Sequence, residues 1–386
     1  MHKKLLAAAV AGALAAPGIA LAQVTISGKV GVSFQSAKMS GATVARLGNT
    51  SFTSINDNTS TLNFRMREDL GGGLAAYGQF EFRQTTDAGS AAGTGATGGP
   101  PQWIGLESKG WGNLRVGTLT GLHAVTGPDY TVATGTSYNS AQILAGGYAQ
   151  AGSTYAMLTR PRNTIAWDSL TFNGFKMTAA YSTNAGAADA DLSALARKGR
   201  MWNLIPQYTA ANWSASLSII DSKPDNGAGP LVATLLDEKG TRLSGEYKFA
   251  NGFSLGGMWD KAKRKNVGAV APGDVNDRVV WALEALYSTG PHQVAAAYTK
   301  AEKDKKLPGT GGAVGADTDA SALGVIYRYS LSKRTNVFAS WQKLTNKAAA
   351  AYGAFGLNTP AYTTVGFAAT AGEDVTNMMV GMNHHF

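Results

Sequence analysis

The chain alternates between apolar and polar residues at a period of two over most of its length after residue 22. In segment 24–34 the apolar residues Val24, Ile26 and Phe34 have polar neighbours, and segments 213–219 and 242–249 repeat the pattern. Successive side chains of a β-strand point to opposite faces, so each segment has one apolar and one polar face. No stretch after residue 22 sustains helical periodicity as well. The pattern predicts an all-β protein.

The connections between the expected strands fall into two length classes that alternate along the chain. Seven are short turns, at about 69–73, 109–113, 169–174, 209–212, 250–252, 288–291 and 330–335. Eight are long loops, at about 35–60, 84–101, 118–160, 183–199, 221–240, 261–277, 301–319 and 345–374. Together they predict sixteen antiparallel strands. An even strand number, with short turns at one rim and long loops at the other, is typical of a transmembrane β-barrel of the outer-membrane type.

A soluble antiparallel barrel is the alternative, but it would turn its apolar face inward and has no reason to sort its loops by length. The aromatic residues favour the membrane version, because many lie near strand ends on the apolar face, where rings suit the headgroup region. They are Tyr181, Trp202, Trp213, Trp259, Trp281, Tyr287, Tyr298, Tyr327, Tyr329 and Trp341. We expect them to form two girdles around the barrel.

Residues 1–22 are expected to be a cleaved signal peptide. A basic start with Lys3 and Lys4 precedes an Ala/Leu-rich stretch, and Ala20-Leu21-Ala22 forms a small-x-small cleavage site. A retained membrane anchor is the alternative, but Pro17 and Gly18 interrupt its short apolar core. The expected domain organisation is therefore a signal peptide at 1–22 and a barrel at 23–386, exported to the outer membrane of a Gram-negative cell.

Composition narrows the class further. The 386 residues are 44% apolar and 15% charged, with 48 Gly, no Cys and a net charge of +9. Apart from the N-terminus, no apolar run approaches the length of a spanning helix, which excludes a bundle of membrane helices. The absence of cysteine excludes a disulfide scaffold. Because the basic residues are spread at period two instead of clustered on one face, nucleic-acid binding is not expected.

Several motifs resemble those of the trimeric general porins of Gram-negative bacteria, particularly the neisserial and β-proteobacterial branch. The resemblance spans the chain after residue 22, with Val24–Gly28, Glu68–Leu74, Asn163–Ser169, Tyr329–Thr335 and Val380–Phe386. The sequence departs from the family pattern at Gly31, Thr118 and Leu170, where an aspartate, an arginine and a proline are usual. The resemblance implies a homotrimer in outer-membrane lipid and lipopolysaccharide, and passive diffusion of small hydrophilic solutes without a cofactor.

The resemblance also implies that the third long loop folds inward and narrows the pore. This is the longest connection, about Thr118 to Thr159, and in the family its acids face an arginine ladder on the opposite wall. Here the loop contains one acid, Asp129. Four tyrosines of the loop are candidate solute contacts: Tyr130, Tyr138, Tyr148 and Tyr155.

The alternation also assigns charged residues to the pore lining. The expected constriction and selectivity residues are Lys29, Arg65, Arg67, Glu81, Arg83, Arg115, Asp129 and Arg162. Over the whole barrel ten inward bases face five inward acids, and the first five strands hold five bases and one acid, Glu81. A narrow passage concentrates ions opposite in charge to its lining, so we expect a preference for anions.

The end of the sequence carries an expected assembly signal. Met378, Val380, Met382 and His384 share one face with Phe386, a terminal aromatic residue of the kind that the barrel-assembly machinery reads. Alternatively, Phe386 only closes the aromatic girdle beside the first strand.

No catalytic or metal site is expected. The rings of His384 and His385 point to opposite faces of a strand and do not chelate one metal, and no Ser/His/Asp set lies in a recognisable motif. Two alternative functions remain open: a substrate-specific channel with a solute site at the third loop, and a surface adhesin or receptor whose loops bind a partner.

Overall fold

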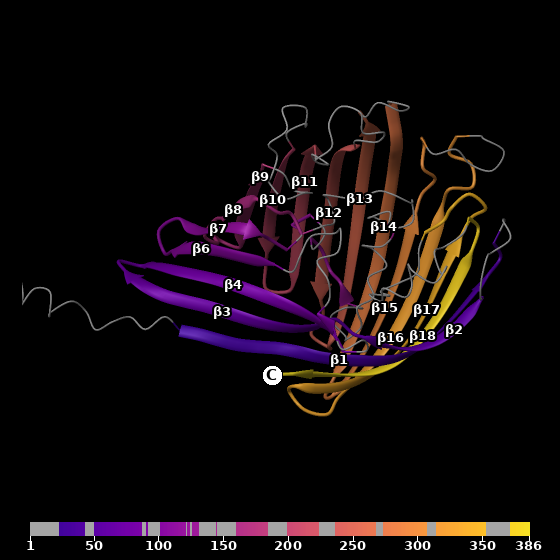
Figure 1. Cartoon of the computed structure of the whole chain (residues 1–386), viewed down its shortest axis with the longest axis horizontal. Helices are drawn as coiled ribbons and strands as arrows, with labels where there is room; N and C mark the ends of the chain where they lie inside the picture. The colour runs from indigo at the N-terminus through magenta and orange to yellow at the C-terminus, as the bar shows by residue number, and fades with distance from the viewer. Residues whose placement is uncertain are drawn as a thin grey trace, which may run out of the picture.

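The computed structural model describes residues 23–42, 50–86, 90–91, 101–120, 122–123, 126–130, 144, 160–183, 199–223, 236–267, 273–306, 314–352 and 371–386. Eighteen strand segments lie in these residues (Figure 1), and they form one continuous antiparallel sheet. The first nine are β1 (Gln23–Ser40), β2 (Ser51–Asp57), β3 (Ser60–Gly71), β4 (Leu74–Thr85), β5 (Ser90–Ala91), β6 (Gln102–Ser108), β7 (Gly112–Thr118), β8 (Thr164–Asp168) and β9 (Phe175–Ser182). The others are β10 (Arg200–Thr209), β11 (Trp213–Lys223), β12 (Leu236–Lys248), β13 (Phe253–Asn266), β14 (Gly273–Thr289), β15 (His292–Ala301), β16 (Ala320–Ser330), β17 (Thr335–Asn346) and β18 (Asp374–His385). None of the described residues belongs to a helix long and apolar enough to cross a membrane.

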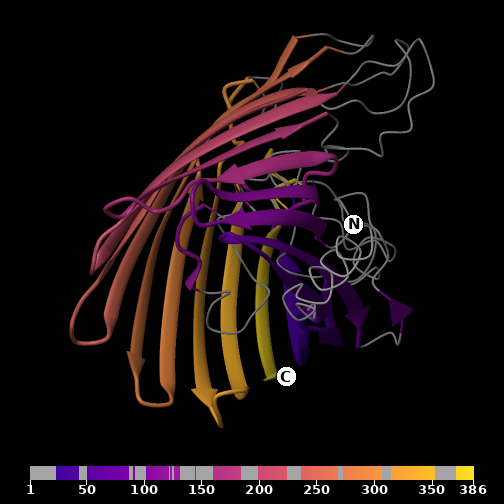
Figure 2. The same cartoon turned by 90° about the vertical axis from the view of Figure 1, so that its left-hand side faces the viewer.

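The eighteen segments make a barrel wall of sixteen strands, as predicted. Both β2 and β3 pair with β1, and the break between them lies at Asn58 and Thr59, where Thr59 has a φ of 60°. Likewise, β5 and β6 both pair with β4. Every strand pairs with its neighbours in the chain, and β1 pairs with β18 to close the ring (Figure 2). Closure satisfies the backbone hydrogen bonds that an open sheet edge would expose to lipid.

The strands extend further into the long connections than their apolar pattern predicted. The loop expected at 35–60 begins only after β1 ends at Ser40, and the one expected at 261–277 narrows to the residues between Asn266 and Gly273. The alternation continues in these extensions, but the outward residues become Ser or Lys. The apolar signal therefore ends at the edge of the lipid band, while the hydrogen-bonded ladder continues beyond it.

The outer face of the barrel is apolar and carries aromatic rows. Cross-strand register places Trp202 opposite Tyr181, and Trp259 opposite Trp281. A second row lies nearer the short turns, where Trp213 pairs with Tyr247. Exposed leucines and valines lie between the rows: Leu204, Leu243, Leu283, Val294, Leu323 and Val325. These rows agree with the expected girdles, and a wall that exposes apolar side chains outward suits a hydrocarbon surrounding.

Candidate pore constriction

The predicted basic residues gather on one side of the bore. Lys29, Arg65, Arg83 and Arg115 lie on β1, β3, β4 and β7, which are close neighbours in the wall. Register sets both Lys29 and Arg83 opposite Thr61 of β3, so these two bases lie at one level. The structure therefore brings this part of the predicted set together on one wall.

Two of these bases, and Arg67 of β3, have acidic partners on the same wall. Arg67 contacts Glu107 at 3.1 Å, Arg83 contacts Glu81 at 3.0 Å and Arg115 contacts Asp168 at 2.8 Å. Lys176 of β9 approaches Asp168 as well, at 3.8 Å. These partners offset part of the positive charge that the arginines present to the bore.

The predicted count of one acid on the first five strands was wrong. Glu107 shares the inner face with Arg67, and Asp57 lies on β2 and within electrostatic range of Lys29. The strand-end position of Glu107 hid its orientation, and Asp57 fell in a region expected to be a loop. With Glu81, this wall thus carries three acids beside its five bases. Its net positive charge is smaller than expected.

Arg162 lies just before β8 instead of on the wall strands. Its backbone carbonyl accepts hydrogen bonds from the hydroxyls of Thr164 and Ser182, at 2.8 and 2.6 Å. These bonds fix the point where the third long loop returns to the barrel.

The described part of the third loop enters the bore and contacts the opposite wall. The backbone N–H of Tyr130 donates to Glu284 of β14 at 2.6 Å, and the Tyr130 hydroxyl donates to Glu246 of β12 at 3.0 Å. Asp129 is within electrostatic range of Glu284. Around the wall, β12 and β14 lie about half-way from β3 and β4. Asp129, Glu246 and Glu284 therefore lie across the bore from the bases on β1–β7, although β12–β14 also carry the inward bases Arg242, Arg264 and Arg278.

Tyr130, a predicted solute contact, is buried in this structure. Its ring packs with Ala295, Ile326, Phe338 and Met379 on the inner face of β15–β18. Burial and the nearby carboxylate of Glu246 raise the pKa of its hydroxyl, which therefore stays protonated and donates. The other predicted tyrosines of the loop, Tyr138, Tyr148 and Tyr155, lie outside the described residues.

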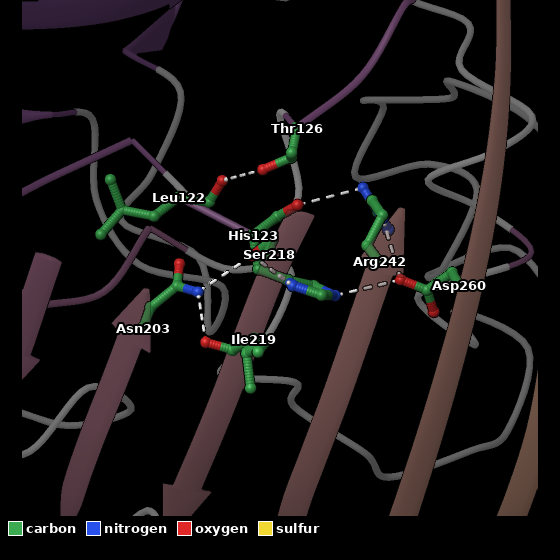
Figure 3. Close-up of polar contacts among 8 residues, drawn as sticks. All are labelled: Leu122, His123, Thr126, Asn203, Ser218, Ile219, Arg242 and Asp260. Carbon is green, nitrogen blue, oxygen red and sulfur yellow. Dashed lines mark hydrogen bonds and ion pairs between the residues drawn. The ribbon is translucent and has the colours of Figure 1, made fainter. Parts of the chain in front are cut away.

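A second attachment of the third loop was not predicted. His123 inserts between the inner faces of β11 and β13, with Nδ1 2.8 Å from Ser218 Oγ and Nε2 3.0 Å from Asp260 Oδ2 (Figure 3). Arg242 of β12 donates to the same Asp260 oxygen at 2.9 Å and to the backbone carbonyl of His123 at 3.1 Å. We call His123, Ser218, Arg242 and Asp260 the loop clamp.

The loop clamp is a structural device. Because Asp260 accepts from Nε2–H, Nδ1 is the acceptor for the Ser218 hydroxyl, which defines a neutral tautomer of His123. Burial lowers the pKa of His123, in agreement with this neutral form. Although Ser, His and Asp meet here, each is no more than 2% exposed, so no substrate reaches them.

The loop makes a third contact through Leu144, which is fully buried. It lies in an apolar cluster with Met39, Met258, Val280, Ala282, Ala301, Ala320, Ala322, Leu344, Ala350, Tyr352 and Val375. These residues belong to the inner faces of β1 and β13–β18 and to the segment after β17. Small alanine side chains leave room for Leu144 against this part of the wall.

Phe386 lies at the seam that closes the barrel. Its backbone N–H and carbonyl exchange hydrogen bonds with Gly28 of β1, at 3.1 and 3.0 Å. A Cβ built on Gly28 would lie 2.5 Å from the Phe386 ring and 2.4 Å from the Thr61 carbonyl oxygen. Only glycine therefore fits where the ring packs on β1.

A closed sixteen-stranded barrel, apolar outside, charged inside and crossed by an inserted loop, is the architecture of an outer-membrane channel. Consistent with this, residues 7–349 match the family model described as Gram-negative porin. The chain belongs to the Gram-negative porin family. The family and the fold are those of a channel protein and not of an enzyme, which confirms the prediction from the sequence.

Individual relatives agree with this assignment. The chain is 29% identical over 207 residues to an outer membrane porin protein of Bordetella pertussis, and the match covers 50% of each protein. Among solved structures, an anion-selective porin from Comamonas acidovorans has a TM-score of 0.70 at 23% identity, covering 95% of this chain and 100% of that chain. OmpF of Salmonella typhi, in complex with daunomycin, has a TM-score of 0.60 at 14% identity, covering 95% and 98%. These structural likenesses concern the fold.

Proposed function

We propose that the protein is an outer-membrane channel for passive diffusion of small hydrophilic solutes and ions, with a preference for anions. The observation that carries the proposal is the asymmetry of the bore. The described loop residues His123, Tyr130 and Leu144 contact the inner face of β11–β18, and the predicted basic residues lie on the wall of β1–β7 across the bore. That wall has more bases than acids, and a narrow passage concentrates ions of the opposite sign.

A relative supports the same preference, because a structure of similar fold is described as an anion-selective porin. The test is the reversal potential of the purified channel in a planar bilayer under a KCl gradient. A reversal potential closer to the equilibrium potential of chloride than to that of potassium supports the proposal. A clearly cation-selective potential refutes the anion preference but not the function as a diffusion channel. Arg65→Gln is expected to move the potential toward the cation side, since Arg65 makes no ion pair with any described residue.

A substrate-specific channel is the second candidate, and a recess beside the third loop favours it. The recess holds about 240 Å³ and is lined mainly by hydroxyl and amide groups, among them Thr126, Gln207, Ser214 and Ser244. Such groups hydrogen-bond neutral polyols. Saturable block of ion current by one sugar or polyol would support this function, whereas a purely linear dependence on solute concentration would exclude it. The adhesin or receptor alternative concerns loops that lie largely outside the described residues.

We further propose that residues 1–22 are removed on export, that the channel assembles as a homotrimer and that its outer rim contacts lipopolysaccharide. Lys239, Lys261 and Lys263 support the last point, since they face outward beyond the Trp259 row on adjacent strands. A mass spectrum of the purified protein that begins at Gln23 would support cleavage, and an intact N-terminus would exclude it. Cross-linking in native membranes tests the trimer, and a monomer alone would contradict it.

A further inference from the structure

A recess in the wall lies where β18 closes the barrel onto β1. It holds about 430 Å³ and is lined by Ser27, Gly28, Lys29, Thr59, Thr61, Asn63, Arg65, His385 and Phe386. Register places Lys29 between Thr61 of β3 and His385 of β18, in one row across three strands. The recess therefore combines two cationic side chains, an imidazole and several small polar groups on the inner wall.

Two basic residues of the recess lack the partners that the other bases of this wall have. Arg67, Arg83 and Arg115 each contact a carboxylate at 2.8–3.1 Å. Within the described part of the chain, neither the side chain of Lys29 nor that of Arg65 makes an ion pair or a hydrogen bond. Their positive charges are thus available to a solute, whereas those of the paired arginines are partly satisfied.

The surrounding groups suit an oxyanion. Thr61 accepts a hydrogen bond from Asn63 at 3.4 Å, which leaves its hydroxyl hydrogen free to donate into the recess. The opposing charge is Asp57, which lies within electrostatic range of Lys29. Asp57 already accepts from the Ser60 backbone N–H and the Thr86 hydroxyl, at 3.0 and 2.9 Å. Two cations and a free hydroxyl donor thus outweigh this one carboxylate, which is already engaged.

The spacing of the cations fits a small anion in transit. Arg65 lies four residues beyond Thr61 on β3, which is about 13 Å along the strand toward the short turns. Lys29 therefore lies at the same height in the barrel as Arg83, and Arg65 lies closer to the short-turn rim. An anion that has passed the third loop meets these two charges in succession.

We infer that the recess between β1, β3 and β18 is a binding station for small oxyanions, in which a phosphate or carboxylate group binds at Lys29 and Thr61 and, closer to the short turns, at Arg65. The inference rests on the proposed channel function and deepens it. It assigns the anion contact to the unpaired bases at the closure seam and not to the paired arginines Arg67, Arg83 and Arg115.

Single-channel recording in potassium chloride tests the station. Inorganic phosphate, and acetate in a separate arm, are added to one side of the bilayer at a time. Saturable reduction of the chloride current is expected, with a lower half-blocking concentration when the anion enters from the short-turn rim. Block by phosphate alone or acetate alone supports the station and identifies the group it prefers.

Variants separate the station from general lumen charge. Lys29→Gln and Arg65→Gln are each expected to raise the half-blocking concentration about tenfold, the usual size of one lost charge-assisted hydrogen bond. Thr61→Val, which changes no charge, is expected to raise it several-fold without moving the reversal potential. Lys343→Gln removes an exposed lysine of β17 and is the matched control, with block unchanged.

The outcomes distinguish this inference from the proposed function. Absence of saturable block by both anions overturns the station, as does block that neither Lys29→Gln nor Arg65→Gln weakens. The reversal potential in KCl alone, recorded before any oxyanion is added, reports the anion preference separately. Assembled barrels of each variant are confirmed by gel mobility before and after heating, so a folding failure is not counted as lost binding.

Discussion

Replacing His123 with alanine is expected to loosen the third loop while leaving the barrel intact. The substitution removes the two side-chain bonds by which the loop reaches Ser218 and Asp260. Arg242 still pairs with Asp260 at 2.9 Å, and Asn203 still donates to Ser218 at 2.9 Å. Ser218 and Asp260 thus keep hydrogen-bond partners on the wall. The substitution therefore weakens only the attachment of the loop.

The size of the effect follows from the two bonds. A hydrogen bond between neutral groups contributes about 1 kcal/mol, and one to a charged group contributes about 1.5–3 kcal/mol. Loss of both weakens docking by about 3 kcal/mol, which is roughly two orders of magnitude in the equilibrium between docked and released loop. Because Tyr130 and Leu144 also hold the loop, we expect brief excursions and not a permanently open bore.

Single-channel recording measures these excursions as open-channel current noise, and swelling of channel-containing liposomes measures the size cut-off for sugars. His123→Ala is expected to raise the noise and to admit larger sugars. His292→Ala is the matched control, since His292 is exposed and its ring bonds Tyr327 at the short-turn rim. If His123→Ala leaves both noise and size cut-off at the wild-type level, the loop clamp does not hold the loop.

Three further outcomes are expected. Because burial lowers the pKa of His123, the released loop binds more protons than the docked loop. The attachment of the loop is therefore complete above about pH 6.5, and below that pH it weakens by up to about 1.4 kcal/mol per pH unit. Current noise that rises in acid in the wild type but not in His123→Gln would establish this, and equal pH dependence in both would contradict it. The Cβ of Gly28→Ala would lie 2.4–2.5 Å from backbone and ring atoms, so this variant is expected to lose about 1–3 kcal/mol of barrel stability. The temperature at which the assembled barrel dissociates should fall accordingly. Gly257→Ala is the control and is expected to be tolerated, because the nearest atom to its Cβ would lie 3.4 Å away. Deleting Phe386 is expected to reduce the amount of assembled barrel in outer-membrane fractions, and an unchanged amount would argue against an assembly signal.

The wall of the barrel could be predicted from the sequence because its strands and turns depend on local sequence patterns. Period-two alternation sets the facing of each strand, and turn length sets the rim at which it reverses. Thus the loop expected at 183–199 lies between strands that end at Ser182 and begin at Arg200. The predicted strand ends were wrong where the outward face stops being apolar, as beyond Phe34. Apolar outward residues mark only the part of a strand that faces lipid, whereas the backbone hydrogen bonds between strands continue beyond that part.

The constriction was only partly predictable, because it depends on contacts between distant segments. The inward facing of Arg242 and Asp260 follows from alternation, and their pairing follows from the hairpin register. Nothing near His123 indicates that it reaches this pair, since 137 residues separate it from Asp260. Likewise, Tyr130 resembled a solute contact by its residue type, and its burial depends on side chains from four other strands.

The loop and the basic wall act together to define the path for solutes. The inner faces of β14–β16 carry Ala282, Ala295, Ala301, Ala320 and Ala322, all no more than 2% exposed. Small residues there leave room for Tyr130 and Leu144 of the third loop, which pack against this apolar surface. In the proposed channel, Tyr130 and Leu144 on that side place the passage nearer to β1–β7, where Lys29 and Arg65 lie. A basic wall opposite an alanine-lined inner face therefore produces a stronger field in the passage than the same charges would produce around a centred bore, because solutes are held closer to them.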